Sequence, residues 1–101
     1  MEYRINENEN EREIMMEGSF GFEDNSVVEL LVESLGAGHG GNVVLNLSRL
    51  EKIDSAGLGM IVLIKDEVAA TGGSFVVRGA AGQVQKMLDV SRFSQLMTVQ
   101  P

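Results

Sequence analysis

Residues 43–59 read VVLNLSRLEKIDSAGLG, and this stretch decides the fold. It opens on a nearly continuous apolar run, Val43 to Leu47, of the kind found in strands that are buried on both faces of a sheet. A polar stretch from Ser48 to Lys52 follows. From Leu58 onward the apolar residues recur at helical spacing. The stretch therefore predicts a buried strand that leads, through a short connection rich in small residues, into a helix.

The rest of the chain alternates strands with helices in the same way. The capping-box spacing of Ser26 and Glu29 predicts the start of the first helix. The predicted elements are strands within 3–5 and 14–20, a helix at 26–35, the strand at 43–47, a helix from 58 to about 71, a strand at 74–78, a helix at 80–88 and a last apolar segment, Phe93, Leu96, Met97 and Val99, that closes the core. Such alternation implies an α/β fold with parallel crossovers and helices packed against one sheet.

Length and charge narrow the class of protein. The chain has 101 residues, which predicts a single domain spanning 1–101, and a net charge of −7. Ten of the 15 acidic residues fall within residues 1–33, so direct binding of nucleic acid is not expected. We read this acidic stretch as a solvated sheet edge, with electrostatic guidance of a basic partner as the alternative. No signal peptide or membrane span is expected, which predicts a cytoplasmic protein without membrane insertion.

Few residues could support catalysis or metal binding. The chain has no cysteine, and its single histidine, His39, lies in the glycine-rich loop 36–41, which we expect to be a connector. That loop lacks the lysine of a phosphate-binding loop and follows a helix instead of a strand. We therefore predict no catalytic residue, no metal and no cofactor.

The segment from Asp54 to Gly59 is the best candidate site, because it joins a buried strand to a helix. Ser55 could serve as the N-cap of that helix. The helix dipole there would tolerate or stabilise a phosphate on Ser55. Ala56, Gly57 and Gly59 have almost no side chains, which suits close approach by another molecule. Ser55 could equally be a plain cap, with the glycines only letting the helix pack on the sheet, and the residues alone leave both interpretations open.

The helix that follows offers a second signal. Met60, Leu63 and Ile64 lie off the main apolar stripe. Apolar residues on a face expected to be wet often mark a binding surface, although neighbouring helices could also cover them.

The stretch 43–59 closely resembles the STAS domain of bacterial anti-sigma factor antagonists. In that family a buried strand leads through a short loop to a D-S-x-G-L-G motif at the start of a helix. The segments 18–20, 72–77 and 84–91 also resemble family elements, so the likeness covers essentially the whole chain. The resemblance implies a small mixed sheet of about four to five strands, with helices mainly on one face.

The resemblance also implies a mechanism. Ser55 would be phosphorylated by a serine kinase of the histidine-kinase-like ATPase class, which is also an anti-sigma factor. The unphosphorylated chain would bind that kinase, phosphorylation would release it, and a serine phosphatase would reset Ser55. The partner-binding residues would be Asp54, Ala56, Gly57, Leu58, Gly59, Met60, Leu63 and Asp24.

One departure from the family concerns the loop after the second strand. Family members often carry an aspartate there, and the matching position is Gly21. We expect Asp24 to take the role of that aspartate. Asn46, at a position that is often aspartate, is a milder change that could cap the strand end.

Three hypotheses follow. The first is a phosphorylation-switched binding module. The second is a non-switching STAS scaffold or nucleotide-sensing subunit of a larger assembly such as a transporter. The third, a small enzyme, has no nucleophile–base pair to support it.

Overall fold

The structure, a computed structural model, describes residues 1–7, 10–36 and 41–101, and its elements alternate as predicted. His39 and most of the glycine-rich loop lie outside the described residues. The elements are β1 (Glu2–Glu7), β2 (Glu11–Phe20), the 3-10 helix η1 (Phe22–Asp24), α1 (Asn25–Gly36), β3 (Asn42–Ile53), α2 (Ser55–Ala70), β4 (Ser74–Arg78), α3 (Gly82–Val90), the 3-10 helix η2 (Phe93–Gln95) and β5 (Thr98–Gln100).

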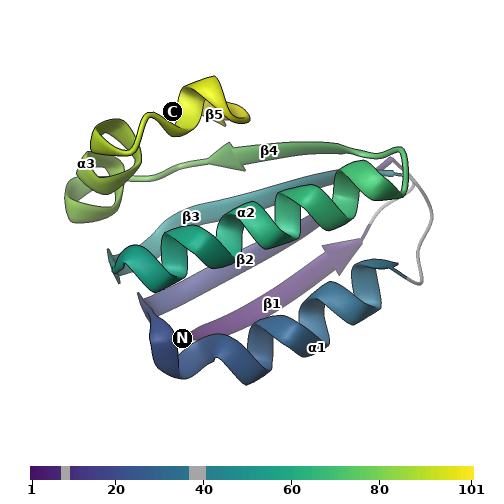
Figure 1. Cartoon of the computed structure of the whole chain (residues 1–101), viewed down its shortest axis with the longest axis horizontal. Helices are drawn as coiled ribbons and strands as arrows, with labels where there is room; N and C mark the ends of the chain where they lie inside the picture. The colour runs from purple at the N-terminus through teal and green to yellow at the C-terminus, as the bar shows by residue number, and fades with distance from the viewer. Residues whose placement is uncertain (8–9, 37–40) are drawn as a thin grey trace.

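The strands form one mixed sheet in the order β1-β2-β3-β4-β5. β1 pairs with β2 antiparallel, and the other three pairings are parallel. α1 and α2 lie side by side over the same face of the sheet (Figure 1). α3 lies beside the N-terminal end of α2. The predicted fold class, a small mixed sheet with its helices mainly on one face, is confirmed.

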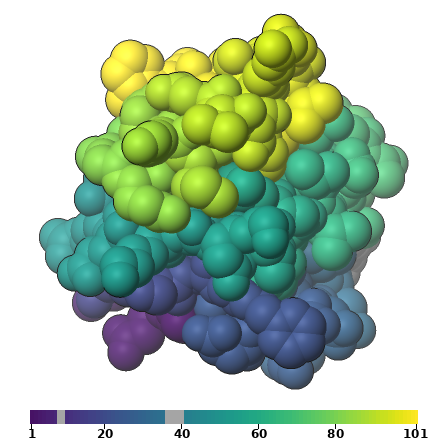
Figure 2. Space-filling view, turned by 60° about the vertical axis from the view of Figure 1, so that its left-hand side comes forward, coloured from purple at the N-terminus to yellow at the C-terminus, as the bar shows by residue number. Residues whose placement is uncertain are grey.

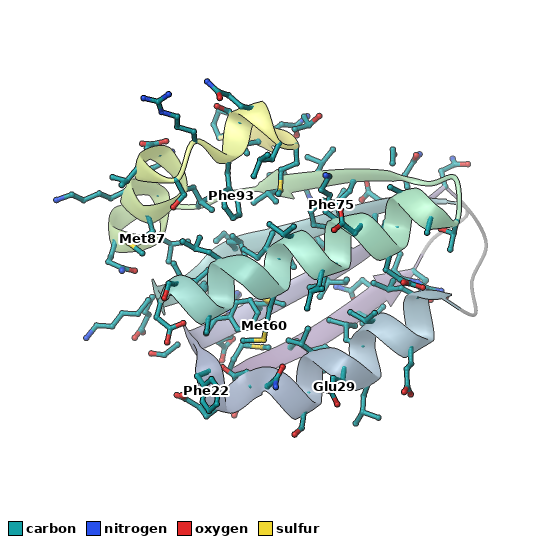
Figure 3. The ribbon with its side chains drawn as sticks, in the orientation of Figure 1. Phe22, Glu29, Met60, Phe75, Met87 and Phe93 are labelled. Carbon is teal, nitrogen blue, oxygen red and sulfur yellow. The ribbon has the colours of Figure 1, made fainter. Side chains whose placement is uncertain are left out.

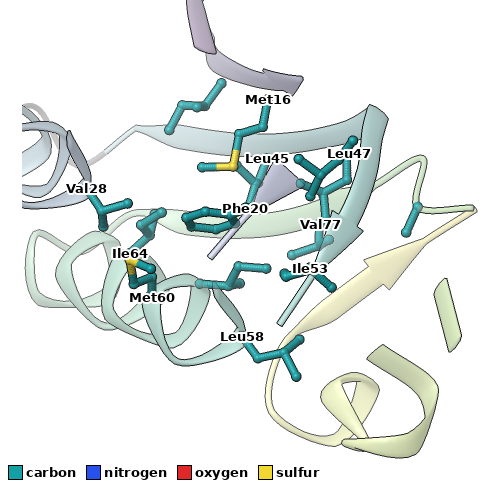
Figure 4. Close-up of a cluster of buried hydrophobic side chains, with 14 of the residues drawn as sticks. Met16, Phe20, Val28, Leu45, Leu47, Ile53, Leu58, Met60, Ile64 and Val77 are labelled. Carbon is teal, nitrogen blue, oxygen red and sulfur yellow. The ribbon is translucent and has the colours of Figure 1, made fainter. Parts of the chain in front are cut away.

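The core lies between the sheet and α2. The register aligns Ile14 with Leu45 and Leu45 with Val77, so one row of fully buried side chains crosses three strands. Phe20 from β2 packs in the same cluster, beneath the helix (Figure 4). The alternation of these side chains with polar ones explains why the strands bury only one face completely.

The opposite face of the sheet carries a polar network centred on Glu13 of β2. Its carboxylate accepts from Asn46 Nδ2 at 3.1 Å, from Arg78 Nη2 at 2.8 Å and from Asn6 Nδ2 at 3.4 Å. These bonds, that of Asn46 foremost, lower the pKa of Glu13 below its ordinary value of 4.5, because they favour the charged form. The network joins four neighbouring strands.

The structure corrects three local predictions. The central strand does not end at Leu47: β3 continues to Ile53, so residues 48–52 are strand and not loop. Ser26 does not cap the first helix, because α1 begins one residue earlier and follows η1 directly. Leu96 does not close the core, since it is 50% exposed.

α2 begins very close to the sheet. A Cβ atom at Gly57 would lie 2.7 Å from Ile53 Cγ1 and 2.7 Å from the Phe20 carbonyl oxygen. At Gly59, two residues further along the same helix, a Cβ atom would meet nothing within 4 Å. Gly57 is therefore required by packing, whereas Gly59 is not.

We predict that Gly57→Ala and Gly59→Ala change stability in opposite directions. Gly57→Ala should destabilise by about 1–3 kcal/mol, because β3 or α2 must shift to admit the methyl group. Gly59→Ala should stabilise by about 0.5–1 kcal/mol, because alanine loses less backbone entropy in a helix. Chemical denaturation of both variants checks this, and equal effects would contradict it.

We also predict that Glu13 makes stability depend on pH. Because its pKa is lowered in the folded state, its contribution is present above the ordinary glutamate value and is lost as the pH falls through the folded-state pKa. Between about pH 6 and about pH 3, wild type should therefore lose more stability than Glu13→Gln. Urea unfolding at each pH measures this. Glu29→Gln, on the exposed surface of α1, is the control and should keep the wild-type slope.

Candidate functional site

Ser55 is the first residue of α2 and is exposed. Among the residues that the structure describes, its hydroxyl has no hydrogen-bond partner. A hydroxyl that is free and at the surface can be reached by a partner's active site without first breaking an internal contact.

Asp54, and not Ser55, caps the helix. Its backbone is extended, and its Oδ1 accepts from the Gly57 N–H at 2.9 Å. The expectation that Ser55 serves as the N-cap was therefore wrong: the carboxylate of the preceding residue satisfies the amide instead. The Ser55 side chain therefore has no part in capping the helix, and the Asp54 carboxylate holds a negative charge next to it.

The same carboxylate covers Gly21 at the end of β2. A Cβ atom at Gly21 would lie 2.6 Å from Asp54 Oδ2. A side chain at position 21 would therefore displace Asp54 or be displaced by it. In the conformation that Asp54 adopts in this chain, position 21 therefore has room only for glycine.

Asp24 has an internal role. It is only 5% exposed, and its Oδ2 accepts from the Gly21 N–H at 2.9 Å. Its Oδ1 accepts from the Met1 amino group at 3.0 Å. The structure therefore shows Asp24 shaping the segment formed by Gly21 and η1, so any effect on a partner would be exerted through that segment.

The predicted partner-binding residues divide by exposure. Asp54 and Gly59 are exposed, and Leu63 is 55% exposed. Gly57, Leu58 and Met60 are buried and Ala56 is half-buried. Met60 points into the space between α1 and α2 (Figure 3), as expected of a core residue. Ile64 is also fully buried, so of the three residues off the apolar stripe only Leu63 reaches the surface.

Sequence reasoning missed Phe22. This residue of η1 is 74% exposed and points away from the body of the molecule (Figure 3). The available signal was an aromatic residue between Gly21 and Glu23, outside any apolar period. Figure 2 shows the end of the molecule where α1 and α2 begin and where α3 lies. η1, which carries Phe22, directly precedes α1 and contacts α2, the helix that Ser55 begins.

Two other classes of site are absent from the described part of the chain. No group of three or more His, Asp or Glu side chains there could hold a metal ion. No described helix is long and apolar enough to cross a bilayer.

Solved structures of other proteins have a similar fold, among them the following three. An anti-sigma factor antagonist from Mycobacterium paratuberculosis superposes with a TM-score of 0.85 at 14% identity, covering 99% of this chain and 85% of that one. The Bacillus cell fate determinant SpoIIAA, in its phosphorylated form, gives 0.69 at 17% identity, covering 97% and 90%. A sulfate transporter family protein from Wolinella succinogenes gives 0.71 at 16% identity, covering 87% and 74%.

The sequence itself also matches a family. A search of curated proteins finds no match. A family model described as Mlab, STAS domain, matches residues 4–99. This match spans nearly the whole chain and agrees with the mixed sheet, the helices on one face and the helix that starts at Asp54-Ser55. The chain therefore belongs to the STAS domain family.

Proposed function

We propose that this STAS domain is an anti-sigma factor antagonist, a binding module switched by phosphorylation of Ser55. When Ser55 is unphosphorylated, the domain binds a serine kinase that is also the anti-sigma factor. When Ser55 carries a phosphate, the complex dissociates, and a serine phosphatase restores the binding form. The catalysis belongs to the kinase and the phosphatase, and the proposed compartment is the cytoplasm, where ATP is available.

The observation that carries the proposal is the free, exposed hydroxyl of Ser55 at the first position of α2. In the proposed reaction Ser55 Oγ forms a bond to the γ-phosphorus of ATP held by the kinase. The bond between that phosphorus and the leaving oxygen of ADP breaks, and the hydroxyl proton passes to a base of the kinase. Nothing in this chain has to act as the base.

Charge explains why phosphorylation would release the partner. A phosphoserine carries about −1.5 to −2 charges at neutral pH. It would stand beside the Asp54 carboxylate, which already occupies the Gly57 amide. The helix end can therefore offer the phosphate less compensation than an uncapped one, and the added charge would face the partner.

Two exposed apolar side chains support the proposed binding surface. Phe22 lies on η1, which contacts α2, and Leu63 is a large apolar residue of α2 that is 55% exposed. Aromatic anchors of this kind often contribute most of the affinity of a protein interface.

A second function is a non-switching scaffold or nucleotide-sensing subunit in a larger assembly such as a transporter. The fold shared with a sulfate transporter family protein favours it. In that case Ser55 would be only a surface residue at the start of α2. The two functions differ in whether Ser55 accepts phosphate.

We predict that the cognate kinase with ATP adds one phosphate to the wild-type protein, on Ser55. Intact-mass spectrometry and peptide mapping measure the incorporation. Ser55→Ala should take up none, while Ser94→Ala, which removes an exposed serine in η2, should behave as wild type. Unmodified wild type, or full incorporation in Ser55→Ala, would contradict the switch.

We further predict that Ser55→Asp binds the kinase about tenfold more weakly than Ser55→Ala, because a second negative charge beside Asp54 opposes the complex. Isothermal titration calorimetry measures both affinities. Ser94→Asp adds the same charge away from α2 and should bind like wild type. Equal affinities of Ser55→Asp and Ser55→Ala would argue against control by charge.

A further inference from the structure

The end of β3 extends beyond its neighbouring strand on one side. β4 pairs with β3 only from Asn42 to Asn46. β4 ends at Arg78, and Gly79, where φ is +81°, begins the connection to α3. Among the described residues, no strand pairs with the second half of β3 along that edge, although β3 continues to Ile53 and carries the site at its end.

Gln83 of α3 substitutes for a strand at this edge. Its Oε1 accepts from the Ile53 N–H at 2.9 Å, and its Nε2 donates to the Ile53 carbonyl oxygen at 2.9 Å. Both polar groups of one residue in β3 are thus satisfied by one side-chain amide, with the same donor and acceptor that a neighbouring strand would offer.

The other edge of the same segment is held by β2. Phe20 pairs with Ile53, and the Asp54 N–H donates to the Phe20 carbonyl oxygen at 3.2 Å. The peptides that lead into Ser55 are therefore held from both sides, by β2 and by Gln83. Asp54 then fixes the start of α2 through Gly57.

We infer that Gln83 is a positioning residue for the phosphoacceptor site, holding the end of β3 so that Ser55 is presented in one orientation. The effect of Gln83 on the kinase reaction rests on the proposed function. Its grip on the strand end, meaning its two hydrogen bonds to the Ile53 backbone, does not.

The role is separable from the attachment of α3 to the domain. α3 packs through Val84 and Leu88, which are both buried in the core. Gln83 is exposed apart from its contact with the Ile53 peptide. Removing its amide should therefore loosen the strand end while leaving α3 docked.

Hydrogen exchange tests the grip directly. Gln83→Met has a side chain of similar length but neither donor nor acceptor, so the Ile53 amide should exchange about tenfold faster, as expected for the loss of one hydrogen bond. The Leu45 amide, in the middle of β3, should keep its wild-type rate. Gln85→Met is the matched control, because the side chain of Gln85 donates to Asp89 Oδ1 within α3, at 3.1 Å, and not to β3.

A second variant keeps the test decisive if Gln83→Met folds poorly. Gln83→Glu retains an acceptor for the Ile53 N–H and loses the donor to its carbonyl oxygen. Its Ile53 amide should therefore exchange faster than that of wild type, but by less than the roughly tenfold expected when both hydrogen bonds are lost.

Kinase kinetics test the consequence for Ser55. If fewer molecules present Ser55 correctly, KM of the kinase for Gln83→Met should rise about threefold to tenfold with kcat unchanged. Wild type and Gln85→Met should have equal KM values. If wild type is not phosphorylated at all, the proposed function fails, and the exchange result alone judges the grip.

Three results would overturn the inference. An unchanged Ile53 exchange rate in Gln83→Met would show that the amide does not hold the strand end. Equal acceleration at Ile53 and Leu45 would show a loss of global stability instead of a local role. An unchanged KM, with Ile53 exchange accelerated and wild type phosphorylated, would show that the grip does not matter for Ser55.

Discussion

The parallel pairing of β2 with β3 is the constraint on which the site depends. The two strands end together at Phe20 and Ile53, and the Asp54 N–H reaches across to the Phe20 carbonyl oxygen. This alignment brings Asp54 over Gly21 and directs its other oxygen to the Gly57 amide. One carboxylate therefore connects the end of β2 with the start of α2. Ser55 follows it immediately and inherits its position.

Close packing reinforces the same junction. Gly57 lets α2 approach the end of β3 more closely than any residue with a Cβ atom would allow. The row of apolar side chains from Ile14 to Val77 then fixes the helix over the sheet. On the uncovered face, Glu13 and its partners tie four strands together with polar contacts. The two faces thus use different physics, burial on one and charge-assisted hydrogen bonding on the other.

Much of this architecture could be predicted, because it depends on local periodicity. The buried run at 43–47, the helical spacing after Leu58 and the D-S-x-G-L-G motif led to the right order of elements and to the fold class. The errors involve contacts distant in sequence. The polar residues 48–52 look like a loop because their pairing with β2 is not visible in their own composition. Met60 looked exposed because it lies off the main apolar stripe of its helix. The neighbouring α1 covers it, and only the assembled fold reveals that. The exchange of roles between Ser55 and Asp54 is smaller in scale, since both residue types are good caps.

Asp54 already caps the start of α2 when Ser55 would be phosphorylated, and this affects how a phosphate on Ser55 could act on a partner. A phosphate on Ser55 would find the Gly57 amide already occupied by Asp54 Oδ1, so the start of α2 would neutralise only part of its charge. The electric field of such a phosphate extends beyond direct contact, but salt screens it. At physiological ionic strength the field decays over about 8 Å. The phosphorylated and unphosphorylated forms of the domain would then differ less in shape than in electrostatic potential. The salt concentration would therefore determine how strongly a partner's affinity differs between the two forms.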